Sequence, residues 1–579
     1  MTKSIAEVHA ELTAPGQPFE MEELDIRGVR TRVWKNAPPT LRDILIASRA
    51  HGDRDYLVMA SEHAGEQDPN DRLTFEQHFR RVATLAHRLI DDFGVKPGDR
   101  VAIMMRNFPE WVTAFWATTV TGAIVVPLNA WWTPDELEYG IADSGSTVVF
   151  ADQQRAERIA DSFKALGIDG RVIVARGPGT PSAGTLRFED VMGDVGDDVT
   201  LPDVPLAPED DATIFYTSGT TGRPKGALGT HRNICTNLLS LMFAGARGGL
   251  RRPADAPPVK EQVGPNRVLL PVPLFHVTGC HSLLVTNTFI GGTLFMMFRW
   301  DPDRALELIE SERLTYFGGV PSMVLQVLNS PKFDTADVSS LCNIGYGGAP
   351  ASRELARRIE AMFPGRTPTN GYGLTETSSL ATANSGVDYL LHTESVGAAV
   401  AVCDVKIADE KGDPLPSGEI GELWIKGPNI IKGYWNKPEA TSTTFTHGWL
   451  HTGDVARIDE ENFIYIVDRA KDMVIRGGEN ISCIEVESAI YDNPAVADCA
   501  VIGIPHHELG EEVGAVVQLK GGQQLSEDEL KAFLGAHLSS FKVPVRIWFR
   551  DEALPRNAAG KILKRELREE LTGAASTGT

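Results

Sequence analysis

A run of hydroxyl side chains, glycines and one lysine stands between an apolar strand and a predicted helix. It reads Tyr216-Thr217-Ser218-Gly219-Thr220-Thr221-Gly222-Arg223-Pro224-Lys225-Gly226. Glycines let the backbone turn its N–H groups toward an anion, hydroxyls add donors, and a lysine adds a positive charge. The segment therefore predicts a cradle for the β- and γ-phosphates of ATP. Its expected ligands are Thr217, Ser218, Gly219, Thr220, Thr221, Gly222 and Lys225.

This segment differs from a Walker A loop, because Gly226 follows Lys225 where a Walker A loop has a Ser or Thr for magnesium. For the Gly-Thr-Thr-Gly portion alone, a surface turn is an equally good interpretation. The full segment directly follows the apolar strand Ala212 to Phe215, and this context favours the phosphate cradle.

A second segment places an aromatic residue and a carboxylate close together, and it reads Asn370-Gly371-Tyr372-Gly373-Leu374-Thr375-Glu376-Thr377. Tyr372 offers a flat face to a purine, and Glu376 offers a hard oxygen ligand to Mg²⁺. A Gly-Tyr-Gly turn alone is a common structural feature. Together with the phosphate cradle, it indicates a nucleotide site.

Two further segments carry isolated charged groups. Asp454, in Trp449-Leu450-His451-Thr452-Gly453-Asp454, has a carboxylate that can accept two hydroxyl donors, although a hairpin with a surface ion pair is the alternative. Lys561 follows Gly560 near the end of the chain, where a lone loop lysine is normally only solvated.

The order of these segments resembles that of the adenylate-forming superfamily, which includes acyl-CoA synthetases, coumarate-CoA ligases, luciferases and peptide-synthetase adenylation domains. The resemblance runs from about residue 40 to about residue 570. It implies that Thr375 contacts the α-phosphate, Glu376 holds Mg²⁺, Asp454 and Arg469 hold the ribose, and Lys471 is a hinge. It also implies that Lys561 is the catalytic lysine, which reaches from the small domain to the carboxylate and the α-phosphate, where a fixed cation offsets developing charge.

The resemblance assigns more residues to the nucleotide and to coenzyme A. Around the nucleotide it implies Gly348, Ala349, Pro350, Asn370, Gly371, Tyr372, Gly373 and Leu374, and for the pantetheine channel of CoA it implies Arg476, Gly477, Gly478 and Asn480. Cys483 stands where relatives often have a nearby proline, and a buried thiol is the expected state because no histidine lies beside it.

The acyl pocket is expected to involve His276, Val277, Cys280, Gly318, Gly319, Val320 and Gly347. Amino-acid-activating relatives usually place an aspartate near the position of His276, and none stands here, which disfavours an amino acid substrate. His276 is expected in a catalytic or pocket role, with a satisfied core histidine as the alternative. Some long-chain relatives carry a gating tryptophan where Cys280 stands, so its absence predicts an ungated or differently shaped tunnel.

The composition agrees with a large enzyme. The 579 residues have a formal charge of -22 and are 42% hydrophobic, which allows a large core and more than one domain. No basic stripe is available for nucleic acid or an anionic membrane. Six scattered cysteines without a CxxC pattern disfavour a disulfide framework or zinc site and are typical of a cytoplasmic protein. No signal peptide is evident, and the uncharged stretch Trp111 to Trp132 is expected to be a buried helix and strand.

Alternating helix and strand signals from residue 74 onward predict an α/β fold, in which helices cover parallel sheets. Thr74 and Gln77 form a capping-box pattern. Residues 176–210 are expected to be a connection, and residues 246–266 an exposed, mobile insertion. We expect an N-terminal extension over 1–37, a large AMP- and acyl-binding domain over 38–470, and a small mobile α+β domain over 471–579.

We therefore expect an ATP-dependent acyl-CoA synthetase that uses ATP, Mg²⁺ and CoA and forms an acyl-adenylate. The expected acids are medium- or long-chain fatty acids first, and aryl or steroid-side-chain acids second. An acyl-AMP ligase that loads a carrier protein, a luciferase-type oxygenase and a non-catalytic nucleotide-binding scaffold are the alternatives. The expected partners are small molecules, and the sequence leaves open whether the chain forms a homodimer.

Overall fold

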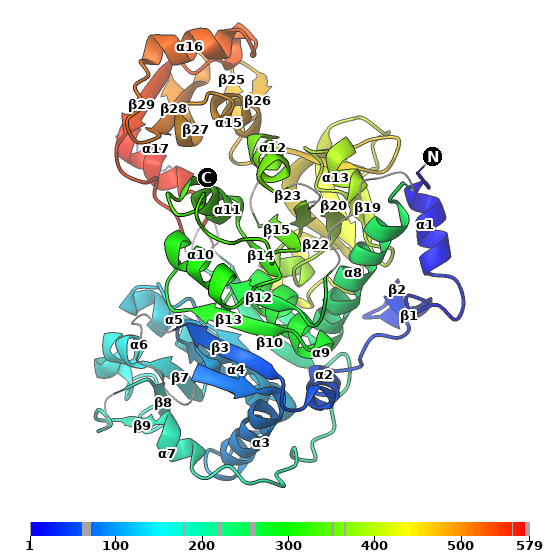
Figure 1. The fold of residues 1–579 in the computed structure, drawn as a ribbon, viewed down its shortest axis with the longest axis vertical. Coiled ribbons are helices and arrows are strands. Elements are labelled where there is room, and N and C mark those ends of the chain that lie inside the picture. The colour runs from blue at the N-terminus through cyan, green and yellow to red at the C-terminus, as the bar shows by residue number, and fades with distance from the viewer. Residues whose placement is uncertain are drawn as a thin grey trace.

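Two large sheets form the body of the protein, and a smaller domain follows them (Figure 1). The computed structural model describes residues 2–60, 71–177, 180–217, 223–253, 262–348, 353–363, 366, 368–557 and 560–573. The α/β fold class with a large N-terminal and a smaller C-terminal domain is confirmed. The exact domain boundaries stay a prediction.

The first large sheet has eight strands, of which only β11 is reversed, so that its pairings with β10 and β21 are antiparallel. In spatial order they are β21 (Gly433–Tyr434), β11 (Lys225–Thr230), β10 (Asp211–Thr217), β6 (Ile124–Pro127), β5 (Arg100–Met104), β7 (Val148–Asp152), β8 (Val172–Ala175) and β9 (Thr185–Arg187). Its outer face packs against α5 (Pro134–Ser144) and α6 (Gln153–Arg158).

The second large sheet has nine strands, with antiparallel pairs only toward its two edges. In spatial order they are β18 (Ala398–Ala399), β17 (Thr382–Asn384), β16 (Pro368–Tyr372), β15 (Asn343–Gly347), β14 (Tyr316–Gly319), β12 (Arg267–Leu270), β13 (Thr293–Met297), β3 (Asp55–Ala60) and β4 (Arg72–Thr74). Its outer face is covered by α10 (Pro302–Ser311), α11 (Pro321–Asn329) and α12 (Arg353–Met362).

The main hydrophobic core lies between these two sheets and includes the helices that separate them. These helices are α2 (Leu41–Ser48), α3 (Phe75–Asp91), α4 (Pro109–Val120), α8 (His231–Leu250), a π-helix (Thr278–Val285) and α9 (Thr286–Ile290). Thr74 caps α3 in the predicted capping box with Gln77. The uncharged stretch forms buried α4 and β6, as expected, and no described helix is long and apolar enough to cross a membrane.

An antiparallel sheet completes the large domain and leads to the small one. It contains β19 (Asp404–Ala408), β20 (Gly421–Lys426), β22 (Phe445–Thr446), β23 (Trp449–Ile458) and β24 (Ile464–Arg469), with α13 (Val387–Leu391) and α14 (Pro438–Thr444) nearby in the chain. The small domain contains β25 (Val474–Arg476), β26 (Glu479–Ile481), α15 (Cys483–Tyr491), β27 (Val496–His506), β28 (Gly510–Leu519), α16 (Glu527–Gly535), β29 (Arg546–Arg550) and α17 (Lys564–Thr572).

The first residues pack on the large domain through α1 (Ile5–Leu12), β1 (Met21–Ile26) and β2 (Val29–Trp34). The ring of Trp34 on β2 lies 5.1 Å from the ring of Phe243 on α8. This segment therefore contributes to the core as well as extending the chain.

Two expectations about connections are wrong. Residues 176–210 contain β9 and α7 (Phe188–Met192), whose short apolar patterns are masked in the sequence by surrounding Gly, Pro and Asp. Residues 246–250 continue α8, and Arg247 and Arg251 are buried instead of exposed. Arg247 donates to the carbonyl oxygens of Ala383 and Ala399, so its polar head is satisfied by a neighbouring strand. Residues 254–261 of the expected insertion lie outside the described residues.

Candidate active site

Asp454 lies at the centre of a small network that joins two sheets. It is buried on β23, where it pairs in register with Arg469 of β24. The Nε of Arg469 lies 2.8 Å from Oδ1 of Asp454, and the hydroxyl of Tyr372 donates to Oδ2 over 2.6 Å. Each carboxylate oxygen keeps a further lone pair, so Asp454 can still accept ribose hydroxyls.

Tyr372 has a second role, in orienting the Asp454 carboxylate, that the sequence did not predict. Burial and the neighbouring Asp454 carboxylate raise the pKa of its phenol well above the ordinary range. The hydroxyl therefore stays protonated and orients the carboxylate, while the ring remains the predicted platform for a purine.

Lys561 reaches the same network from the small domain. The pKa of its ammonium is lowered to about 8, first by burial and then by Arg469 and Lys471, while Asp472 and Asp454 act in the opposite direction. These influences show that Lys561 shares one electrostatic environment with the Asp454–Arg469 pair.

The loop before Lys561 holds its position through local bonds and one close approach. The backbone N–H of Lys561 donates to Oδ1 of Asn557 over 2.9 Å. Gly560 has a positive φ of 77°, and a Cβ there would lie 2.6 Å from Cγ2 of Val320. Only glycine allows the loop to dock this closely against Val320, at the start of α11 in the large domain. Ala558 and Ala559 lie outside the described residues.

The two ends of the predicted phosphate cradle lie next to Glu376. Thr217 ends β10 and Lys225 begins β11, and the two residues pair in register. The ammonium of Lys225 lies 5.2 Å from the ring centre of Tyr434, whose hydroxyl donates to Oε1 of Glu376 over 2.7 Å. Ser218, Gly219, Thr220, Thr221 and Gly222 lie outside the described residues.

Glu376 fits a magnesium site that the ligand completes. No group of three or more His, Cys, Asp or Glu side chains suited to a metal occurs in the described ranges. Mg²⁺ usually binds one or two carboxylates together with substrate phosphates and water, so one carboxylate beside a phosphate cradle is sufficient.

The segment around Thr375 and Glu376 is held in an unusual backbone conformation. Thr375 and Glu376 lie in a single 3₁₀ turn, and Ser378 and Ser379 after it have φ values of 52° and 104°. A Cβ at Gly373 would collide with the carbonyl oxygen of Ser379, so this position requires glycine. Such strain persists only where the surroundings enforce it, and it often marks functional sites.

Several predicted nucleotide residues lie on the neighbouring strands. Asn370 and Gly371 are on β16 and Leu374 follows that strand, whereas Gly347 ends β15 opposite Gly371. Gly348 has a φ of 75°. Ala349 and Pro350 lie outside the described residues.

His276 and Val277 lie between β12 and the π-helix that contains Cys280. Burial alone lowers the pKa of His276 to about 4, and no carboxylate contributes to the shift. Its buried Nε2 has no hydrogen-bond partner among the described residues. His276 is therefore neutral at physiological pH.

Cys280 packs fully buried in the main core, and burial raises the pKa of its thiol well above the ordinary range. Gly318, Gly319 and Val320 lie at the carboxyl end of β14, on the sheet that also carries Gly347. The predicted acyl residues are thus distributed over this sheet and the π-helix.

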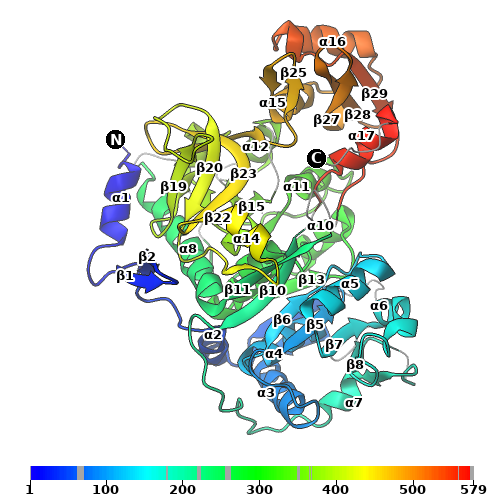
Figure 2. The same cartoon turned by 180° about the vertical axis from the view of Figure 1, so that it is seen from behind.

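The predicted CoA residues lie elsewhere. Gly477 and Gly478, with φ values of 57° and 92°, form the two-residue turn of the β25–β26 hairpin. Two positive φ angles in succession favour Gly-Gly in such a turn. Arg476 makes a bidentate pair with Glu512, at 2.7 and 2.9 Å, and Asn480 is exposed. Figures 1 and 2 place β25 in the upper part of the small domain, while α17, which follows Lys561, lies at its lower edge.

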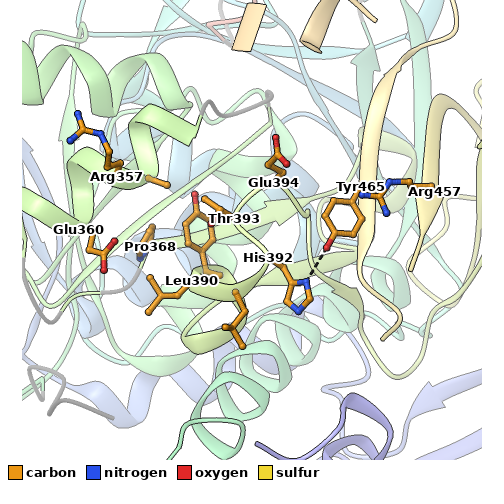
Figure 3. A pocket seen from close by; sticks show the side chains of 12 residues that line it. Arg357, Glu360, Pro368, Leu390, His392, Thr393, Glu394, Arg457 and Tyr465 are labelled. Atoms are coloured by element: carbon orange, nitrogen blue, oxygen red, sulfur yellow. Dashed lines mark hydrogen bonds between the residues drawn. The ribbon is translucent and has the colours of Figure 1, made fainter. Parts of the chain in front are cut away.

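A separate pocket of about 540 Å³ opens between α12, α13 and β24 (Figure 3). None of the predicted site residues lines it. The candidate active site is instead centred on Asp454 and Arg469 with Lys561 beside them, and Glu376 lies in the 3₁₀ turn that follows Tyr372, the hydrogen-bond partner of Asp454.

Sequence reasoning missed two residues that position this site. Tyr434 contacts Glu376 from a strand 58 residues away, and buried His281 bonds through Nδ1 to the carbonyl oxygen of strained Ser378 at 3.1 Å. Neither residue belongs to a local motif. Only the register of β21 on β11 and the turn of the π-helix bring them to the site.

Comparisons with known proteins agree with this geometry. The family model described as AMP-binding enzyme matches residues 46–435, and the AMP-binding enzyme C-terminal domain matches residues 485–561. The chain is 38% identical over 496 residues to a feruloyl-CoA synthase of Amycolatopsis, covering 86% of this chain and 93% of that protein. It is 34% identical over 525 residues to a long-chain-fatty-acid–CoA ligase of Bacillus subtilis, covering 86% and 90%.

A solved structure is similar as well. The anthranilate CoA ligase AuaEII, in complex with anthranoyl-AMP, superposes with a TM-score of 0.81 at 26% identity, covering 93% of this chain and 98% of that one. Together with the family matches and the site geometry, this similarity shows that the chain belongs to the AMP-binding enzyme family, as an acyl-CoA synthetase of the adenylate-forming superfamily.

Proposed function

We propose that this enzyme converts an uncharged, hydrophobic carboxylic acid, ATP and CoA into acyl-CoA, AMP and pyrophosphate through an acyl-adenylate. The observation that carries the proposal is the placement of Lys561 beside the Asp454–Arg469 pair. A lysine from the small domain and a ribose-type carboxylate from the large domain then act on one nucleotide.

In the first half-reaction, an oxygen of the acid attacks the α-phosphorus of ATP and pyrophosphate leaves. Asp454 and Arg469 would hold the ribose, and the segment from Thr217 to Lys225 would hold the outgoing phosphates. Bound Mg²⁺ at Glu376 would supply charge neutralisation on the phosphate oxygens. Lys561 stabilises the charge that develops between the carboxylate and the α-phosphate.

In the second half-reaction, the CoA sulfur attacks the acyl carbon, the bond to the phosphate oxygen breaks, and AMP leaves. The hairpin with Arg476 and Asn480 would then serve the pantetheine arm. Because this hairpin and the Lys561 loop lie in different parts of the small domain, the domain must turn between the steps (Figures 1 and 2). Lys471, directly after β24, is the proposed pivot.

For the acid, we favour aryl acids over the fatty acids that the sequence first suggested. Neutral His276, without a charged partner, supports an uncharged acyl group. The 38% identical relative is named a feruloyl-CoA synthase and the superposed ligase acts on anthranilate, which supports an aromatic ring. The 34% identical relative, named a long-chain-fatty-acid–CoA ligase, keeps medium- or long-chain fatty acids as the second candidate.

Pyrophosphate release with a panel of acids, with and without CoA, tests this proposal. Cinnamate and its hydroxylated forms, octanoate, dodecanoate, palmitate and several amino acids form the panel. We expect CoA-dependent turnover with an aryl acid and none with amino acids. Adenylate formation that CoA cannot consume would instead identify a ligase that loads a carrier protein.

The cellular setting remains part of the proposal. All six cysteines are free thiols, and five of them are buried. This agrees with a reducing cytoplasm, where ATP and CoA are available.

A further inference from the structure

The strands behind the Lys561 loop carry four glycines close together on one face. In register, Gly318 of β14 neighbours Gly345 of β15, and Gly347 of β15 neighbours Gly371 of β16. Because side chains alternate along a strand, these four glycines, here called the glycine face, point to the same side of the sheet. Glycine inside a strand weakens it and often marks a place where a ligand approaches closely.

The adjacent strand β12 differs, because it carries large side chains on this side of the sheet. Val268 of β12 pairs with Tyr316 of β14, so Val268 and Leu270 share the side of the glycine face. Both are buried in the main core between the sheets. The same side of the sheet therefore carries large side chains on β12, whereas β14, β15 and β16 present glycine at these four positions.

Tyr316 is the one large side chain that lies over the glycine face from β14. Its phenol oxygen occupies the place of a Cβ on Gly345 and lies 2.7 Å from that of a Cβ on Gly318. Because those glycines stand level with each other, two residues beyond Tyr316, the ring lies along the sheet with its hydroxyl toward the carboxyl ends of the strands.

The hydroxyl of Tyr316 is left without a partner in this position. Burial raises its pKa to about 12, and no hydrogen bond contributes to that shift. Within the described part of the chain no hydrogen bond to this oxygen is found. The Tyr316 side chain is only partly buried, so its hydroxyl is open to a hydrogen bond from a ligand group.

The carboxyl ends of these strands, beyond the glycine face, lie next to the Lys561 loop. Val320 lies two residues beyond Gly318 and touches the position of a Cβ on Gly560, directly before Lys561. Two residues of strand correspond to about 6.6 Å. The interval between the Lys561 loop and the Tyr316 hydroxyl therefore matches an aromatic ring and is too short for an extended long chain.

We propose that Tyr316 ends the acyl site, so that the enzyme selects compact acids, above all aromatic acids whose hydrogen-bonding substituent at the far end meets the Tyr316 hydroxyl. This inference rests on the proposed function, because it assumes that the acyl group lies along the glycine face. It makes Tyr316 a specificity-determining residue.

The test compares acid profiles of the full-length enzyme and three variants, measured as CoA-dependent pyrophosphate release. Tyr316→Ala and the milder Tyr316→Leu should open the far end and raise kcat/KM for dodecanoate at least tenfold relative to cinnamate. Tyr316→Phe should keep the length limit but lower kcat/KM for 4-hydroxycinnamate relative to cinnamate about fivefold, the loss of one hydrogen bond.

Tyr346→Phe is the matched control. Tyr346 lies on β15 but on the opposite face, where its hydroxyl contacts that of Tyr389. The acid profile of the Tyr346→Phe variant should equal that of the wild type. If the Ala and Leu variants keep the wild-type chain-length profile, the proposal is wrong even though the enzyme is a synthetase. If the wild type releases no pyrophosphate with any acid, the proposed function fails first.

Discussion

The Lys561 loop and the β25–β26 hairpin belong to the same small domain but stand in opposite relations to the active site. The loop docks against Val320 and shares the environment of Asp454 and Arg469. In the hairpin, Arg476 is instead occupied by Glu512. Under the proposed function, this arrangement corresponds to the adenylate-forming step, in which the predicted CoA hairpin is not at the active site.

The segment that connects β24 of the large domain to β25 of the small domain is short. Arg469 ends β24, and the N–H groups of Asp472 and Met473 both donate to its carbonyl oxygen. Lys471 lies inside this turn, where partial desolvation of its ammonium lowers its pKa. A few dihedral angles at such a point can absorb a domain rotation.

Removing the positive charge of Lys561 should have the largest effect on activity. Lys561→Ala should lower the rate of acyl-adenylate formation by about 10²–10³-fold, as when one oriented stabilising group is lost. CoA-dependent consumption of pre-made acyl-AMP should survive. Single-turnover assays of both steps decide this, and an equal loss in both steps would refute the assignment of Lys561.

Restricting the pivot should separate the two steps. Lys471→Pro fixes φ near −65° without removing any hydrogen bond described for this turn, since Ala470, Asp472 and Met473 are the donors there. Adenylation should remain near wild type, while thioester formation should fall by about 10²-fold through misplacement of the hairpin. Lys471→Ala is the control and should support both steps; a proline variant with both rates intact would place the hinge elsewhere.

The titration of Lys561 should appear in the pH profile of adenylation. Burial lowers its pKa from 10.5 to about 8, so the required ammonium form is lost as the pH rises through about 8. The kcat/KM for ATP should therefore fall about tenfold per pH unit above that value. Lys561→Arg cannot lose its proton in this range, and its profile should lack the descending limb. A limb that persists in the arginine variant would belong to another group.

The smallest expected effect concerns the β25–β26 hairpin, which is the predicted CoA side. Arg476→Ala should raise KM for CoA about tenfold, the usual contribution of a hydrogen bond to a charged group, and leave adenylation unchanged. Glu512→Gln keeps the shape but releases the arginine, and it should not raise KM for CoA. A CoA dependence that is identical in wild type and Arg476→Ala would remove the hairpin from the thioester step.

Much of the site could be predicted because its residues sit in local motifs. Asp454, Arg469 and Lys561 were expected to meet, and the structure brings them together. The start of α3 was likewise predictable, because Thr74 and Gln77 form a local capping-box pattern that the structure contains.

The remainder depends on long-range register. The partner of Glu376, Tyr434, lies in a two-residue strand that no local pattern announces. Arg247 appears solvent-exposed by composition, but α8 continues far enough to bury it against β17 and β18. The role proposed for Tyr316 could not be predicted from its local sequence, because it depends on the glycines that three neighbouring strands place on one side of the sheet.

The most direct test of the central claim is the distance between the small domain and the large domain during turnover. Spin labels at Asp528→Cys on α16, in the same small domain as the hairpin, and at Asp135→Cys, both exposed positions, would report the domain rotation in a Cys342→Ser background, because Cys342 is the only one of the six cysteines that is not buried. We predict one distance with ATP and the acid and a second distance once CoA is added, with the second absent in Lys471→Pro. A single unchanged distance in an enzyme that completes both half-reactions would contradict the account.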